Sequence, residues 1–130
     1  MSFILVDLAD DQHDIQINGW NWRPTVALLI ETGILPTGER AERCLSQGCG
    51  GYFTEEEVTR SAEFLEGLVA DMKPGERVMF DGSISNKPKN HDLPITEWDE
   101  QEALDHYSAS YEWLLMFIDF CRHSKGFEVC

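Results

Sequence analysis

Basic residues are scarce in this chain of 130 residues. Lys and Arg number 10 against 24 Asp and Glu, so the formal net charge is −14. A surface this negative repels phosphate backbones and anionic lipid, which disfavours direct binding to nucleic acid or to a membrane. The same field accelerates encounter with a basic protein partner such as a toxin or a nuclease. Solubility alone would explain the charge equally well.

Long apolar runs are missing too. None approaches the roughly 18 residues that a membrane-spanning helix needs, and residues 1–6 are too short and too quickly followed by acids to be a signal peptide. We therefore expect a cytoplasmic protein. No repeat or low-complexity tract interrupts the chain, so residues 1–130 are expected to form a single domain. Cysteine is limited to Cys44, Cys49, Cys121 and Cys130, which outside a secretory context are expected to be free thiols.

What the chain does contain is a strongly apolar segment near its end. Between Tyr107 and His123, apolar residues recur at spacings of three, four and seven, which on an α-helix form one stripe. The stripe comprises Tyr107, Tyr111, Leu114, Leu115, Ile118 and Cys121. This pattern predicts a long C-terminal helix at the centre of the core.

The rest of the sequence predicts an α+β fold, in which a small, mainly antiparallel sheet packs against three to four helices. Residues 3–8 and 14–18 predict a β-hairpin whose first strand is the deeper one. Helices are predicted at 24–32, at 38–47 and after Thr54, which forms a capping box with Glu57. A strand is predicted at 76–81, a loop at 82–94, an acidic helix capped by Thr96 at 97–106, and an edge strand at 127–130.

Several of these segments have a familiar composition. They are NGWNWRPTVALL, the TEEE-capped helix, the DG that follows a strand, and the C-terminal YEWLLMFIDFCRHSKGFEVC. Over most of the length the chain resembles small acidic bacterial proteins of the immunity type. The resemblance implies a bacterial or phage origin and a shared fold, and it transfers no activity and no catalytic residue.

Soft metal ligands are present, but their spacing is unusual. The candidates are Cys44, Cys49, Cys121, His123 and Cys130. A structural zinc site needs four ligands that converge, and its ordinary signal is a pair of short Cys or His knuckles. The CxxxxC and CxH spacings differ from that signal, so a zinc-stabilised adaptor is a less favoured hypothesis, and we expect no metal or cofactor.

Cys49 is the most accessible thiol, but acidic surroundings raise a thiol pKa, which argues against a nucleophile.

An alternative function is a small enzyme or ligand-binding domain that uses Trp20, Trp22, Arg23 and Asp81. If residues 20–22 were extended, both indoles would share one face and form a ligand platform. Arg23 could then bind a carboxylate, and Asp81 follows an apolar strand. The competing interpretation is that the tryptophans close the core and that Asp81 forms a turn.

The favoured functional surface is the acidic segment near residue 100. It comprises Glu97, Trp98, Asp99, Glu100, Glu102 and Asp105. These carboxylates could meet a cationic cleft while the indole acts as an anchor, although a solvated helix face would have the same composition. The leading hypothesis is therefore a small acidic binding protein that inhibits a basic partner by steric and electrostatic occlusion, without catalytic residues of its own.

Overall fold

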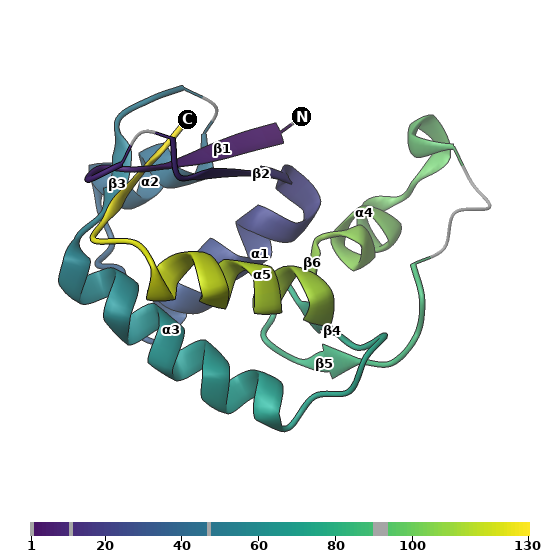
Figure 1. Ribbon diagram of the computed structural model, residues 1–130. Coiled ribbons are helices and arrows are strands. Elements are labelled where there is room, and N and C mark those ends of the chain that lie inside the picture. Colours follow the sequence, from purple (N-terminus) through teal and green to yellow (C-terminus); the bar gives the residue numbers. More distant parts are fainter. Residues whose placement is uncertain (1, 11, 47, 90–93) are drawn as a thin grey trace.

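The computed structural model describes residues 2–10, 12–46, 48–89 and 94–130, and within them it has an α+β fold with two antiparallel sheets (Figure 1). The elements in chain order are β1 (Ser2–Asp7), β2 (Asp14–Asn18), α1 (Gly19–Glu31), α2 (Glu39–Leu45), β3 (Gly51–Phe53), α3 (Glu55–Ala70), β4 (Arg77–Met79), β5 (Ile84–Ser85), the 3-10 turn η1 (Ile95–Glu97), α4 (Glu100–His106), β6 (Ser108–Ser110), α5 (Tyr111–Arg122) and β7 (Phe127–Val129). The predicted fold class is confirmed.

The larger sheet has the strand order β2-β1-β7-β3. Its predicted hairpin is confirmed, with Phe3 paired to Ile17 and β1 the deeper strand. The prediction of β7 as an edge strand is wrong, because β7 pairs with β1 on one side and with β3 on the other. The unpredicted strand β3 takes the edge position instead.

Helix α1 begins five residues earlier than predicted. The side chain of Asn18 accepts a hydrogen bond from the Asn21 backbone N–H at 2.9 Å, so Asn18 caps the helix. Pro24 consequently lies inside the helix and not in its first turn. The predicted end is confirmed: Thr32 is the C-cap, and Gly33 follows with a φ of 79° that suits glycine.

Helices α1 and α5 cover the inner face of the larger sheet, and α3 packs along α5 (Figure 1). Trp22 of α1 is completely buried, and its ring meets Phe53, Phe117 and Phe127 edge-on or tilted, with centroids 5.5 to 6.3 Å apart. Aromatic pairs of this geometry add to the free energy gained by burying their area. Aromatic side chains therefore form the central contact between the larger sheet and helices α1 and α5.

Helix α5 confirms the prediction of a central C-terminal helix but is shorter than the predicted segment. Residues 108–110 form β6 instead, and the Ser110 side chain caps α5 by accepting from the Trp113 N–H at 3.1 Å. Leu115 of the predicted stripe is 43% exposed. The buried residues of α5 are Trp113, Leu114, Phe117, Ile118, Phe120 and Cys121.

The smaller sheet has the order β5-β4-β6 and carries the α4 segment on its flank. Its central strand, β4, confirms the strand predicted at 76–81, while β5 lies within the predicted loop, of which residues 90–93 fall outside the described part of the chain. The predicted Thr96 cap is wrong, because Asp99 accepts from the Glu102 N–H at 2.8 Å and caps α4. The capping box at Thr54 is confirmed. No helix among the described residues combines the length and the apolar character needed to cross a bilayer.

Candidate functional site

The η1 turn and α4 lie on the right-hand side of the molecule in Figure 1 and carry the predicted acidic surface. We call Glu97, Asp99, Glu100 and Glu102 the α4 acidic surface. Three of them are exposed and Glu102 is half-buried. Within the described ranges, neither Glu97 nor Glu100 takes part in a salt bridge. Their negative charge therefore faces solvent.

Asp105 belongs to the same predicted set, but it has a structural partner. Its carboxylate lies 3.2 Å from the guanidinium of Arg77, which is 5% exposed. Arg77 also donates to the Ser108 hydroxyl at 2.9 Å, to the Lys87 carbonyl at 2.9 Å and to the backbone carbonyl of Asp105. One buried guanidinium thus joins β4, β6, the loop after β5 and the end of α4. Sequence reasoning missed Arg77, and alternation in a three-residue strand gives no signal for it.

Trp98 is half-buried rather than projecting as an anchor. Its ring stacks on His106 with centroids 3.8 Å apart and meets Trp20 edge-on at 5.4 Å. Trp20 in turn lies 4.5 Å from the ring of Tyr107. These rings attach α4 to the start of α1. The exposed apolar side chains at this end of the molecule are Phe80, Ile84, Ile95 and Leu104.

A groove separates the β4–β5 hairpin from α4. Its narrower part has a volume of about 280 Å³ and is lined by Met79, Phe80, Asp81, Gln101, Leu104 and Asp105. Four of these residues also line a wider, more polar hollow that extends along the hairpin. We call this the hairpin–α4 groove. It combines apolar walls with carboxylates at its border.

Asp81 lies at the tip of the β4–β5 hairpin. Its Oδ1 accepts from the Ser83 hydroxyl at 2.6 Å and from the Ser83 backbone N–H at 2.9 Å. These hydrogen bonds hold the pKa of Asp81 below its ordinary value. The side chain forms a turn, as the competing interpretation expected, and it presents a fixed negative charge to the groove.

The alternative site does not assemble around Asp81. Trp20 and Trp22 lie on a helix, where residues two apart point about 200° away from each other. Trp22 is buried and donates from Nε1 to the Cys44 carbonyl at 2.8 Å, while Trp20 faces α4. Arg23 donates to the hydroxyl of Tyr107 at 3.2 Å. As far as the chain is described, the three hollows lined by Asp81 contain none of these α1 residues.

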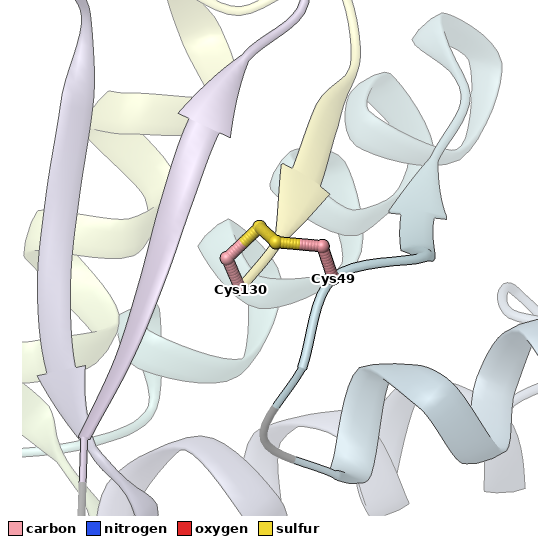
Figure 2. Close-up of a disulfide and its surroundings, with 2 residues drawn as sticks. All are labelled: Cys49 and Cys130. Atoms are coloured by element: carbon pink, nitrogen blue, oxygen red, sulfur yellow. A yellow bond between two sulfur atoms is a disulfide. The ribbon is translucent and has the colours of Figure 1, made fainter.

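The five candidate metal ligands do not converge. Figure 2 shows Cys49, on the loop before β3, joined to Cys130, directly after β7, by a disulfide across a sequence separation of 81. The expectation of four free thiols is therefore wrong for this pair, and Cys49 is not a free nucleophile. The backbone pairing of β3 with β7 brings these distant positions together, which no spacing in the sequence reveals.

The other candidate ligands lie elsewhere. Cys44 and Cys121 are free but buried. Burial raises the pKa of the Cys44 thiol to about 12 and also raises the pKa of the Cys121 thiol, so both stay protonated at neutral pH. His123 is exposed, and its Nδ1 lies 2.8 Å from the Asp119 carbonyl. None of the three can join a site with Cys49 and Cys130.

Glu128 is the acid that sequence reasoning missed beside the cysteine pair. A carboxylate oxygen of Glu128 and the sulfur atoms of Cys49 and Cys130 all lie within 4.8 Å of one another. Glu128 and Cys130 are two residues apart along an extended strand, so their side chains share a face. The ExC spacing was a usable signal once β7 had been predicted as a strand.

The fold and these sites define a small acidic α+β protein with an acid-bordered groove at one end and a disulfide-closed cysteine pair on its larger sheet. No family model matches the sequence, and no curated protein and no solved structure matches it.

Proposed function

We propose that the protein is an acidic binding protein that inhibits a basic protein partner, such as a toxin or a nuclease of the bacterial cytoplasm, by steric and electrostatic occlusion. The observation that carries this proposal is the juxtaposition of the hairpin–α4 groove with the α4 acidic surface. Acids occur on all five α-helices that the structure describes, so charge alone favours no face. What distinguishes this end is that exposed apolar side chains line a groove beside the acids.

The groove suits an apolar side chain of the partner that is flanked by Lys or Arg. Phe80 and Leu104 are each 44% exposed and form opposite walls. Asp81 and Asp105 border the same hollow. A partner that inserts an apolar residue there brings a neighbouring cation against Asp81, whereas Asp105 is already paired with Arg77. Interfaces of this kind concentrate their affinity in the apolar contact, and the charged rim sets the orientation.

The α4 acidic surface serves the approach of the partner. Long-range attraction between the net charge of −14 and a basic protein raises the association rate, and this effect weakens as salt is added. A basic active site covered by α4 and the hairpin would lose access to its own anionic substrate. Inhibition of this kind requires no catalytic group from the acidic protein.

The direct experiment uses the product of the gene that lies next to the gene for this chain. Its binding is measured by calorimetry at increasing NaCl concentration, and its enzymatic or toxic activity is measured with and without the acidic protein. We expect binding that weakens steeply with salt and a parallel loss of the partner's activity. Absence of binding at low salt would contradict the proposal.

A charge-matched pair of variants locates the surface. The triple variant E97Q/E100Q/E102Q removes three charges from the α4 acidic surface, whereas E42Q/E56Q/E63Q removes three exposed charges from α2 and α3. We expect the first to slow association by about tenfold or more and the second by much less. Equal effects would mean that net charge acts without a defined surface. If no defined surface exists, F80A, which removes a wall of the groove, should also leave the affinity for the basic partner unchanged.

A further inference from the structure

We propose that Cys49, Glu128 and Cys130 form a redox-gated site for a soft divalent metal ion such as Zn²⁺. The disulfide closes the site, and reduction opens it by supplying two thiolates beside the Glu128 carboxylate. This inference is independent of the proposed inhibitory function, since the site lies on the larger sheet and shares no residue with the hairpin–α4 groove.

The three ligand atoms are already close enough to share an ion. They lie within 4.8 Å of one another, and ligands around a tetrahedral zinc ion, bound at about 2.3 Å, are separated by about 3.8 Å. Rotation of the two cysteine side chains is sufficient to move the sulfurs from a bond to that separation. Two thiolates, one carboxylate and one water complete a four-coordinate site of the open kind.

The sheet keeps these groups together when the sulfur–sulfur bond is absent. Strands β3 and β7 pair in register, with Gly51 opposite Val129 and Phe53 opposite Phe127. The last two rings are completely buried and stack with centroids 4.6 Å apart. Cys130 continues the strand geometry, because its N–H donates to the Ile4 carbonyl at 2.8 Å. Reduction therefore leaves Cys130 fixed beside the sheet and Cys49 only two residues from the paired strand β3, so the two thiols stay near each other.

The site is also accessible to solvent, unlike the thiols of Cys44 and Cys121. Cys49 is exposed, and Glu128 and Cys130 are half-buried, whereas Cys44 and Cys121 are buried and belong to no group of three or more candidate ligands among the described residues. Thiolates select zinc-like ions over Mg²⁺ and Ca²⁺, which prefer sites built from oxygen alone. The residues thus specify both the place and the chemical class of the ion.

The redox step is ordinary thiol–disulfide exchange. A dithiol reductant attacks one sulfur of the Cys49–Cys130 bond, and its own ring closure to a disulfide releases both cysteines. Two electrons and two protons pass to the protein as two thiols. Binding of Zn²⁺ then displaces those two protons to solvent. Reoxidation by a disulfide reverses the sequence and releases the ion. Because a reducing cytoplasm keeps thiols reduced, the open form would dominate there.

The test uses the full chain, prepared either oxidised or reduced with dithiothreitol that is then removed without air. Zn²⁺ is titrated in competition with a chromogenic chelator, and Co²⁺ is added in a parallel sample to detect thiolate-to-metal charge-transfer absorption. We expect about one equivalent bound by the reduced chain and less than about a tenth by the oxidised chain. Binding that is absent after reduction, or equal in both states, would overturn the proposal.

Two variants assign the ligands. E128Q keeps the size of the side chain and both cysteines, and it should weaken Zn²⁺ binding by about tenfold or more, because a neutral amide replaces the anionic ligand. The control E56Q, an exposed acid on α3, should bind like the wild type. C130S should abolish the Co²⁺ thiolate absorption, with circular dichroism used to verify its fold. Identical affinities for E128Q and E56Q would also overturn the assignment.

Discussion

Two neighbouring tryptophans illustrate how position on a helix determines the role of a residue. Trp22 is completely buried and hydrogen-bonded to the Cys44 carbonyl, while Trp20, two residues earlier, lies half-buried against the α4 segment. We predict that W22F lowers the free energy of unfolding by about 2–4 kcal/mol, because it creates a cavity and leaves a buried carbonyl without its donor. W20F should cost less than about 1 kcal/mol. Urea denaturation monitored by far-UV circular dichroism compares the two, and equal losses would contradict the placement.

Glu57 makes the stability of the protein dependent on pH. Burial would raise the pKa of its carboxyl, but hydrogen bonds from Arg40, at 2.7 Å from Nη2, and from the Thr54 N–H, at 2.9 Å, outweigh burial and hold the pKa below its ordinary value of 4.5. A depressed native pKa means that the unfolded chain binds protons first as the solution is acidified. The stabilising contribution is therefore complete above about pH 4.5 and is lost as the pH falls through the native pKa.

The variant E57Q should remove this contribution. At pH 7 we expect it to cost about 1–3 kcal/mol, because Arg40 keeps its charge without the carboxylate, and its stability should depend less on pH between 3 and 5. The matched control is E56Q, whose carboxylate is exposed on the same helical turn. Unfolding in urea at several pH values separates the two. If E57Q keeps the acid dependence of the wild type, other carboxylates are responsible for it.

At the scale of elements, β3 and α2 approach so closely that only glycine fits between them. A Cβ on Gly51 would lie 2.5 Å from the Cys44 backbone nitrogen, whereas a Cβ on Gly67 of α3 would meet nothing within 4 Å. We predict that G51A destabilises the protein by about 3 kcal/mol or more, because backbone must move. G67A should stabilise it by about 0.5–1 kcal/mol through the higher helix propensity of alanine. Thermal and urea unfolding of both variants test the contrast in sign.

The attachment of α4 depends on Arg77. This guanidinium is almost completely buried and donates to groups from three neighbouring segments. We expect R77K to lose most of these hydrogen bonds, since an ammonium cannot reach several acceptors at fixed angles. Amide hydrogen exchange in α4 should then accelerate by about tenfold or more while exchange in α3 is unchanged, which corresponds to a local loss of about 1.4 kcal/mol. R60K, at an exposed position of α3, is the control, and uniform acceleration would indicate global destabilisation instead.

Elements with strong local signals could be predicted from the sequence, and elements defined by distant pairing could not. The capping box at Thr54 and the alternation at 14–18 each depend on a few adjacent residues, and both were confirmed. Strand β3 is three residues long and follows a glycine run, so it carries no period of its own. The sequence predicts helix where β6 lies, because the apolar spacing of α5 continues backward through Tyr107.

The candidate site was predictable in part for the same reason. The acidic composition of residues 97–105 is legible in the sequence, and the structure places those residues along one edge of the molecule. The groove beside them is formed by the β4–β5 hairpin, about twenty residues earlier, and its position depends on the hydrogen bonds of Arg77. Likewise, Glu128 joins Cys49 only because β7 pairs with β3. Long-range register therefore decides both sites, and a single sequence does not encode it in any local pattern.

At the scale of the whole molecule, one covalent bond encloses most of the chain. The Cys49–Cys130 disulfide spans a sequence separation of 81 and therefore restricts much of the unfolded ensemble. Loop-closure entropy for a ring of this size corresponds to about 4.5 kcal/mol as an upper value, and measured bonds commonly deliver about 2–4. Because the pairing of β3 with β7 already brings the two cysteines near each other in the native state, this effect should act mainly on the unfolded state.

We therefore predict that dithiothreitol lowers the free energy of unfolding of the metal-free wild type by about 2–4 kcal/mol without changing its native circular dichroism. The double variant C49S/C130S should match the reduced wild type and show no response to the reductant.

Zn²⁺ added to the reduced wild type should then raise the free energy of unfolding as it binds, since a ligand that binds only the native state shifts the folding equilibrium. Urea unfolding under four conditions, oxidised, reduced, reduced with Zn²⁺, and reduced with Zn²⁺ in E128Q, measures the bond and the ion separately. A reduced chain that is as stable as the oxidised one would show that the disulfide does not constrain the unfolded chain, whereas a missing response to Zn²⁺ would leave that constraint intact and refute the metal site alone.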